Sequence, residues 1–101
     1  MITIMNMRRS RPSQPYDYRC DRANKILGNH PGQGMPRQES IAAFDKYLSL
    51  HLSDENMNLV RNEMNRIYQL HQQYGQLRLF CWCTPLPCHT ELIKTRLEKV
   101  I

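Results

Sequence analysis

A chain of 101 residues with 41% hydrophobic content can hold one domain with a single modest core, which excludes a two-domain protein. Its 14 basic and 9 acidic residues give a net charge of +5, which favours phosphates, nucleic acids or acidic proteins as partners. No apolar run approaches the ~18 residues of a membrane span, and residues 1–11 lack the order of a signal peptide. We therefore expect a cytoplasmic protein with no membrane partner and with reduced cysteines.

The first third of the chain predicts two strands joined by loops. The apolar run Ile2–Met7 is typical of a buried strand, and Tyr16–Cys20 is a weaker second candidate. Pro12 and Pro15 between them lack the amide proton that regular structure needs, so this stretch is a loop. Residues 21–36 form a second, long loop, and loops of this length in small domains are usually functional or disordered.

The middle of the chain predicts two helices. One follows Pro36, and the other covers residues 54–74, with Ser53 as its N-cap and Gly75 at its C-terminal end. Apolar residues recur in both at steps of three and four, which marks one buried face on each helix. These faces consist of Ile41, Phe44, Leu48 and Leu52 in the first helix and of Met57, Val60, Met64, Ile67, His71 and Tyr74 in the second. A lone histidine on such a face, as at position 71, is more often a packing residue than a ligand.

The last quarter predicts a third strand and a third helix. Residues 77–83 alternate with the two-residue period of a strand, so Cys81 and Cys83 share a face. After the prolines of residues 84–87, a C-terminal helix begins near Cys88 and turns Ile93, Leu97 and Val100 inward. The order of elements predicts a single α/β domain over residues 1–101, with a short, partly parallel sheet of about three strands and three helices.

Three cysteines and a histidine are concentrated in residues 80–89, and three interpretations of them stay open. Cys81, Cys83, Cys88 and His89 can supply three sulfurs and one nitrogen to a zinc ion, although the spacing is unusual for such a site. Alternatively, Cys88 near a helix N-terminus and beside His89 is a reactive thiol with a neighbouring base, which makes these two residues the candidate catalytic pair. The third interpretation is that the cysteines are inert core residues.

Two motifs resemble a small uncharacterised domain family that is common in phage and bacterial genomes. The first is Cys-Trp-Cys, a proline two positions on, and Cys-His at the start of a terminal helix, present here as Cys81-Trp82-Cys83, Pro85 and Cys88-His89. The second is an arginine and a Gly-Asn-Pro-aromatic loop before an acidic helix start, echoed by Arg22, Leu27-Gly28-Asn29 and Glu39. The chain departs from this second pattern where His30 separates Asn29 from Pro31 and where Gly32 replaces the aromatic residue. The resemblance implies a fold and a site but no substrate, and a phage origin would place the protein in the host cytoplasm.

Ligands of open α/β sheets bind at the carboxyl ends of strands, and three chemically distinctive segments follow the predicted strands here. These segments are residues 8–11, 27–34 and 81–89. Residues 1–37 hold seven basic and two acidic residues, so a positive field lies near them. Glycines let backbone amides approach a ligand, Asn29 can adopt a left-handed turn, and Trp82 is a core or rim aromatic that can instead stack on a base. The expected ligand-binding residues are Arg8, Arg9, Arg22, Gly28, Asn29 and Trp82.

Two functions follow from this reading. In the preferred one, the protein binds, and in one version processes, a nucleotide-like phosphate ligand, with Cys88 and His89 at the reacting end. In the alternative, it is a nonenzymatic interaction protein whose basic face binds nucleic acid or a host protein, and a metal held by the cysteines is compatible with either. No carboxylate pair, phosphate loop or hydrolase triad is present in the sequence, so no reaction is assigned.

Overall fold

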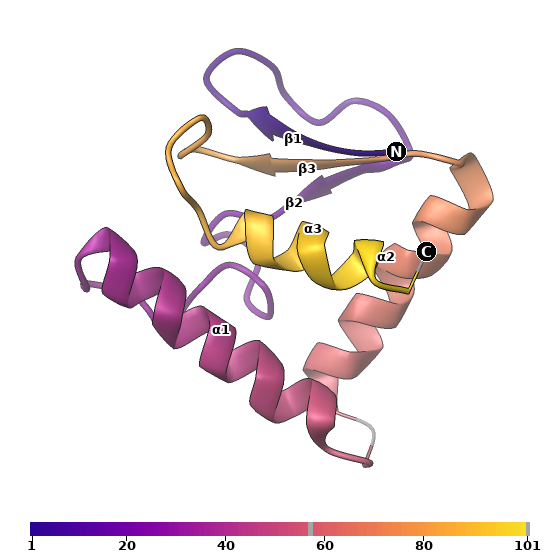
Figure 1. The fold of residues 1–101 in the computed structure, drawn as a ribbon. Helices are drawn as coiled ribbons and strands as arrows, with labels where there is room; N and C mark the ends of the chain where they lie inside the picture. Colours follow the sequence, from indigo (N-terminus) through magenta and orange to yellow (C-terminus); the bar gives the residue numbers. More distant parts are fainter. Residues whose placement is uncertain (57, 101) are drawn as a thin grey trace.

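Three short strands form one parallel sheet, and three helices accompany it (Figure 1). The computed structural model describes residues 1–56 and 58–100. The predicted α/β class, with three strands and three helices, is confirmed. The elements are β1 (Ile2–Asn6), β2 (Asp17–Arg19), α1 (Arg37–Ser53), α2 (Leu59–Tyr74), β3 (Leu77–Cys81) and α3 (Thr90–Glu98).

The last strand of the chain lies at the centre of the sheet. β3 pairs in parallel with β1 on one side and with β2 on the other, so the sheet is parallel throughout and not only in part. Asn6 pairs with Cys81 and Arg19 pairs with Phe80, so all three strands end at the same edge. Because parallel strands share their carboxyl edge, the segments that follow them all start from this edge.

The helices bury their apolar faces against each other and against the sheet. α3 contacts β1 and β3, while α2 contacts β3 and α1. Ile93 and Leu97 of α3 are buried as predicted, but Val100 is 63% exposed and lies beyond the end of this helix, so its predicted inward position is wrong. The core comprises Ile2, Tyr18, Cys20, Leu27, Phe44, Leu48, Val60, Met64, Ile67, Leu77, Leu79, Ile93 and Leu97.

The boundary between α1 and α2 differs from the prediction. α1 continues through Ser53, which is therefore the last residue of this helix and not the N-cap of the next. The N-cap of α2 is Asn58, whose side-chain oxygen accepts a hydrogen bond from the Arg61 amide at 3.0 Å. Gly75 closes α2 in a left-handed conformation with φ 69°, as predicted. Met57, predicted to lie on the apolar face, is outside the described residues.

The sequence predicts no membrane span, and the length and polarity of the helices can be compared with this expectation. Over residues 1–56 and 58–100, every helix is too short or too polar to cross a membrane.

A buried ion pair fastens β2 to β3. Two nitrogens of the Arg78 guanidinium donate to the Asp17 carboxylate at 2.6 and 2.7 Å, and the Asp17 side chain is 1% exposed. Burial alone would raise the pKa of Asp17, but hydrogen bonds from Arg78 and from the amides of Ser13 and Gln14 outweigh it, so this pKa is lowered. The ion pair therefore stabilises the fold at neutral pH.

We predict that Asp17→Asn lowers the free energy of unfolding by about 1–3 kcal/mol at neutral pH, because the guanidinium and two amides lose a charged acceptor. The folded pKa of Asp17 lies below the unfolded value of about 3.9, so the carboxylate contributes above that pH and its contribution is lost as the pH falls through the folded pKa. The difference between wild type and variant should thus shrink in acid. Urea denaturation at several pH values measures it.

Asp45→Asn is the matched control. Asp45 is 56% exposed and lies 3.8 Å from Arg96, so this change should cost no more than about 0.5 kcal/mol. Equal losses for the two variants at neutral pH would contradict the structural role of Asp17.

Candidate functional site

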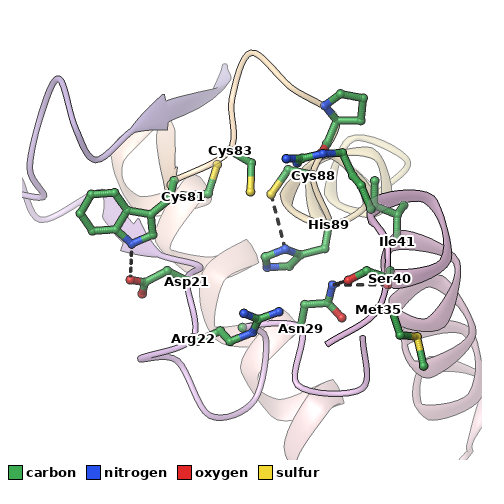
Figure 2. A pocket seen from close by; sticks show the side chains of 14 residues that line it. Asp21, Arg22, Asn29, Met35, Ser40, Ile41, Cys81, Cys83, Cys88 and His89 are labelled. Carbon is green, nitrogen blue, oxygen red and sulfur yellow. Dashed lines mark hydrogen bonds between the residues drawn. The ribbon is translucent and has the colours of Figure 1, made fainter. Parts of the chain in front are cut away.

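A cavity of about 310 Å³ opens at the carboxyl edge of the sheet. Its walls come from the loop after β2, from the start of α1 and the segment that leads into it, and from the end of β3 with the loop after it (Figure 2). Two of the three segments predicted to form the ligand site therefore meet here. The third, which follows β1 and carries Arg8 and Arg9, does not line the cavity.

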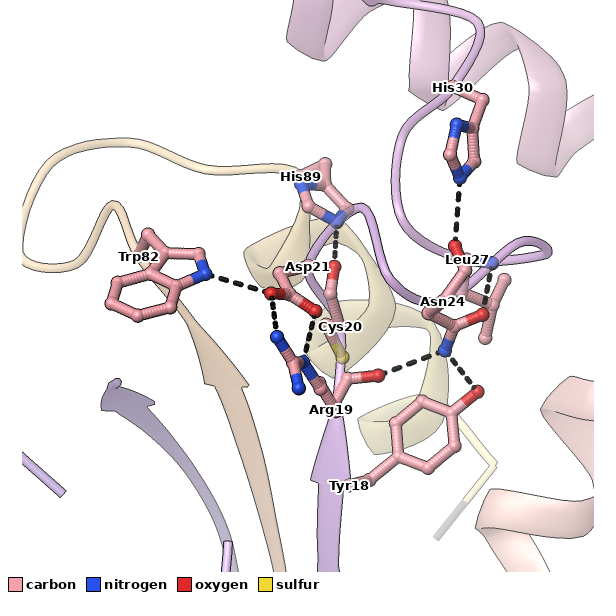
Figure 3. Close-up of polar contacts among 9 residues, drawn as sticks. All are labelled: Tyr18, Arg19, Cys20, Asp21, Asn24, Leu27, His30, Trp82 and His89. Atoms are coloured by element: carbon pink, nitrogen blue, oxygen red, sulfur yellow. Dashed lines mark hydrogen bonds and ion pairs between the residues drawn. The ribbon is translucent and has the colours of Figure 1, made fainter. Parts of the chain in front are cut away.

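Cys88 and His89 lie together in the cavity wall. The Cys88 Sγ atom is 3.4 Å from Nδ1 of His89 (Figure 2). Nε2 of the same ring is 2.8 Å from the carbonyl oxygen of Cys20 (Figure 3). A carbonyl oxygen only accepts hydrogen bonds, so Nε2 carries a proton, and in the neutral ring the lone pair of Nδ1 faces the sulfur. The edge of the imidazole also contacts the Phe44 ring, with centroids 4.9 Å apart.

The surroundings of His89 favour its neutral form. The residue is 8% exposed, and burial lowers the pKa of its imidazole below the usual value. Arg22 adds a repulsive positive charge in the same direction. At neutral pH the ring therefore accepts a hydrogen bond from the Cys88 thiol and is placed to take its proton. This is the arrangement of a nucleophile and its general base.

Cys88 is surrounded by hydrogen-bond donors that favour its thiolate. The pKa of this thiol is lowered by a hydrogen bond from the Cys81 thiol and, despite the opposing effect of burial, by the hydroxyl and amide of Thr90. The Thr90 hydroxyl is 3.4 Å from the sulfur. The Cys81 thiol shows the opposite behaviour, because its hydrogen bond to Cys88 and its burial raise its pKa. The sequence predicted a reactive Cys88 from the helix N-terminus and the neighbouring His89, and it missed the contribution of Cys81.

Gly28 and Asn29 have a structural function in this loop. A Cβ atom on Gly28 would lie 2.3 Å from the backbone oxygens of Asp21 and Asn24, so only glycine fits against this backbone. Asn29 adopts the predicted left-handed conformation, with φ 58°. Its amide nitrogen donates to the hydroxyl of Ser40 at 2.8 Å and to the backbone oxygen of the same residue at 3.3 Å. Its oxygen accepts from the next glycine of the loop, so Asn29 holds the loop to α1 and its polar atoms are already engaged.

Trp82 belongs to a chain of polar contacts along one side of the cavity. Its indole nitrogen donates to Asp21 at 2.8 Å, and Arg19 donates to the same carboxylate at 2.6 and 2.8 Å (Figure 3). The Arg11 guanidinium stacks on the indole at 4.9 Å from the ring centroid. The hydrogen bond from Arg19 lowers the pKa of Asp21 most, and the hydrogen bond from Trp82 lowers it further, although burial raises it. This carboxylate is therefore ionised and paired at neutral pH. Trp82 is thus a rim aromatic, and base stacking on it stays a prediction.

Two cations line the cavity. Arg22 is exposed and, within the described part of the chain, takes part in none of the ion pairs. Arg37, the first residue of α1, donates to the backbone oxygen of Pro87 at 2.8 Å and so joins two walls. Sequence reasoning missed Arg37 and Asp21. Asp21 is the second residue after β2, so the rule that selects post-strand residues would have found it. Only the fold brings Arg37 close.

Arg8 and Arg9 lie on the exposed turn after β1. The first of these arginines has its amide hydrogen-bonded to the Asn6 side chain at 2.8 Å, which shapes the turn. An interaction of this basic turn with nucleic acid or a host protein stays a prediction.

The four predicted metal ligands do not form a metal site in this arrangement. Across residues 1–56 and 58–100, no three histidine, cysteine, aspartate or glutamate side chains are grouped to hold one ion. Cys81, Cys83, Cys88 and His89 all line the cavity, but both nitrogens of the histidine are already in hydrogen-bond contacts. A zinc ion on these residues stays a prediction that requires their side chains to rearrange.

The fold and the site together define a class: small α/β domains with a cysteine–histidine pair at the carboxyl edge of a parallel sheet. Residues 5–99 match the family described as Domain of unknown function (DUF4326), and the chain belongs to that family. The resemblance to an uncharacterised family is thereby confirmed, although the match does not test whether the cysteine motif is the family's signature. No curated protein and no solved structure matches the chain.

We predict that Cys81→Ala raises the pKa of Cys88 and slows its alkylation by iodoacetamide at neutral pH about three- to tenfold, because a donor to the thiolate is lost. Site-resolved mass spectrometry at a series of pH values measures both effects. Cys83→Ala is the control, since the charge interaction with Cys83 raises the pKa of Cys88, so the loss of Cys83 should not slow the reaction. Unchanged alkylation of Cys88 in Cys81→Ala would contradict the assigned hydrogen bond.

Proposed function

We propose that the cavity binds a nucleotide-like phosphate ligand and that Cys88 and His89 act on the ligand from the cavity wall. The observation that carries this proposal is the position of Arg22 and Arg37, which come from different segments and line the same cavity as the cysteine–histidine pair. A guanidinium offers phosphate oxygens a planar fork of donors, so two of them suit a phosphate group.

The charge balance of the cavity supports an anionic ligand. Asp21 is the only carboxylate among the described lining residues, and its charge is already matched by Arg19. Arg22 takes part in none of the ion pairs found among residues 1–56 and 58–100, and Arg37 donates to Pro87 through only one of its guanidinium nitrogens there. The cavity is therefore positive overall, and a positive cleft with low-dielectric walls concentrates anions.

The size and place of the cavity fit a small ligand. Its volume of about 310 Å³ lies at the lower end of the range for small-molecule sites, which suits a mononucleotide rather than a dinucleotide. It opens at the carboxyl edge of a parallel sheet, where ligands of α/β domains usually bind. Trp82, which is 38% exposed, gives the rim an aromatic surface.

The cysteine–histidine pair adds chemistry that simple binding would not need. The base can take the thiol proton, and the resulting thiolate is supported by Cys81 and Thr90. A nucleophile of this kind attacks an electron-poor centre of a bound ligand. A reducing compartment such as the cytoplasm suits this function, since all four cysteines are free thiols.

We predict that wild-type protein binds mononucleotides, and inorganic phosphate more weakly, in isothermal titration calorimetry. Arg22→Ala should weaken binding about 10- to 100-fold, because a charged hydrogen-bonding group is lost. Arg9→Ala removes a similar exposed charge that does not line the cavity, so it should leave the affinity within about twofold.

Two results would contradict the proposal. One is the absence of a heat or a thermal shift with every nucleotide and with phosphate. The other is an equal loss of affinity in Arg22→Ala and Arg9→Ala, which would assign binding to net charge and not to the cavity.

A further inference from the structure

A turn rich in arginine lies at the same edge of the sheet as the cavity. This turn follows β1 and holds Arg8, Arg9 and Arg11, which are all exposed. The Asn6 side chain donates to the backbone oxygen of Thr84 at 2.6 Å, which fastens the start of the turn to the loop after β3. Figure 1 shows both segments on the side of the sheet to which the strand arrows point. The arginine turn is therefore a neighbour of the loop that forms one wall of the cavity.

Trp82 connects the arginine turn with the cavity. Its indole lines the cavity and is 38% exposed. The Arg11 guanidinium lies over the same ring, 4.9 Å from the ring centroid. The indole nitrogen donates to the Asp21 carboxylate at 2.8 Å, which holds the ring by its edge (Figure 3). Proteins bind single strands of nucleic acid with this combination, in which bases stack on an aromatic ring and basic side chains contact the backbone.

We propose that the ligand of the cavity is the terminal nucleotide of a single-stranded nucleic acid. The next base of the strand stacks on Trp82, and the phosphates that follow pair with Arg8, Arg9 and Arg11. This inference rests on the proposed function, because it takes a nucleotide in the cavity as given and names the molecule to which that nucleotide belongs.

The size of the cavity favours the end of a strand. A volume of about 310 Å³ suits about one nucleotide, so the rest of a strand has to leave the cavity over its rim. Trp82 lies at this rim, and Arg11 leads from the indole to the arginine turn. A duplex does not suit this route, because its bases are paired and stacked within the helix and do not reach an aromatic ring.

The charges along this route favour phosphates. Among residues 1–56 and 58–100, Arg8, Arg9 and Arg11 take part in none of the ion pairs. The carboxylate that contacts the indole, that of Asp21, already accepts two hydrogen bonds from Arg19 and so repels a phosphate only weakly. Phosphates that bind to the arginine turn release their counterions, which makes such binding sensitive to salt.

Two titrations of the full chain test the proposal. Fluorescence anisotropy follows a single-stranded DNA of about twelve nucleotides with its dye on an internal base, and calorimetry follows the matching mononucleotide. We expect the strand to bind at least about tenfold more tightly, because it makes contacts outside the cavity as well. Three neutralised phosphates should give a salt slope of about −2 or steeper in a double-logarithmic plot. Saturating mononucleotide should displace the strand, because both occupy the cavity.

A double variant separates the strand from the mononucleotide. Arg8→Ala with Arg9→Ala should weaken strand binding about tenfold or more and reduce the salt slope by about 1.4. The same variant should leave the mononucleotide affinity within about twofold, because neither arginine lines the cavity. Lys46→Ala with Lys99→Ala is the charge-matched control. It removes two exposed charges that do not line the cavity, so strand affinity should stay within about twofold.

Substitutions at Trp82 test the stacked base. Trp82→Leu should weaken strand binding about tenfold, because the aromatic surface for one base is lost. Trp82→Phe loses the donor to Asp21 but keeps a ring, so it should retain most of the affinity. Equal losses in the two variants would contradict base stacking on Trp82.

The outcomes distinguish this proposal from the proposed function. Equal affinities for the strand and the mononucleotide, or equal losses in the two double variants, would overturn the single-strand proposal and leave nucleotide binding intact. Equally tight binding of a duplex, or of polyglutamate, would also overturn it, and the second result would assign the arginine turn to an acidic protein. A strand that saturating mononucleotide does not displace would overturn the terminal position. A mononucleotide that gives no heat would contradict the proposed function itself, and with it the terminal nucleotide in the cavity.

Discussion

The hydrogen bond from Nε2 of His89 to the carbonyl oxygen of Cys20 determines the chemistry of the cavity. It joins the segment after β2 to the start of α3 over a distance of 2.8 Å, although 69 positions separate the two residues in the sequence. Since the carbonyl oxygen can only accept, the bond fixes which nitrogen of the ring holds the proton. The other nitrogen is thereby turned to Cys88 as an acceptor. The assignment of base and nucleophile follows from this single contact with the backbone.

The parallel sheet makes that contact possible. β3 lies between β1 and β2, so the backbone of Cys20 leaves the sheet beside the end of β3 and donates to the Phe80 oxygen at 2.8 Å. The loop after β3 then returns the chain to the same edge, where Cys88 and His89 meet the segment after β2. Phe44 of α1 supports the imidazole from a third direction. Three distant stretches of sequence therefore set the position of one ring.

Many polar side chains in the cavity wall already form hydrogen bonds within the protein. Fewer of them are therefore available to bind a ligand. Asn29 uses its side-chain nitrogen and oxygen on the loop and on α1, and Asp21 is held by an arginine and a tryptophan. All three residues line the cavity, but Arg22 differs from the other two because it is exposed. This contrast between engaged and available groups directs the proposed function to the arginines and the cysteine–histidine pair.

Local patterns in the sequence predicted the elements well, because each depends on neighbours in the chain. The proline before α1 and the glycine after α2 correspond to observed features. The apolar periods do so too, except that Tyr74 and Val100, which were predicted to be buried, are 38% and 63% exposed. The N-cap of α2 was misplaced because Ser53 and Asn58 both suit an N-cap, and only packing decides between them. The site was predicted in part, since the post-strand rule found Cys88 and His89, and the arginine of the second family motif gave Arg22. The post-strand rule also selected Arg8 and Arg9, because sequence alone does not tell which way a turn carries its side chains.

Heteronuclear NMR of the histidine ring nitrogens at neutral pH tests the central claim most directly, with the His89 signals assigned by their loss in His89→Gln. The account predicts a neutral ring protonated at Nε2, with an unprotonated Nδ1 that accepts a hydrogen bond. A ring protonated at Nδ1 and bare at Nε2 would contradict it, because such a ring could neither donate to the Cys20 carbonyl oxygen nor take a proton from Cys88.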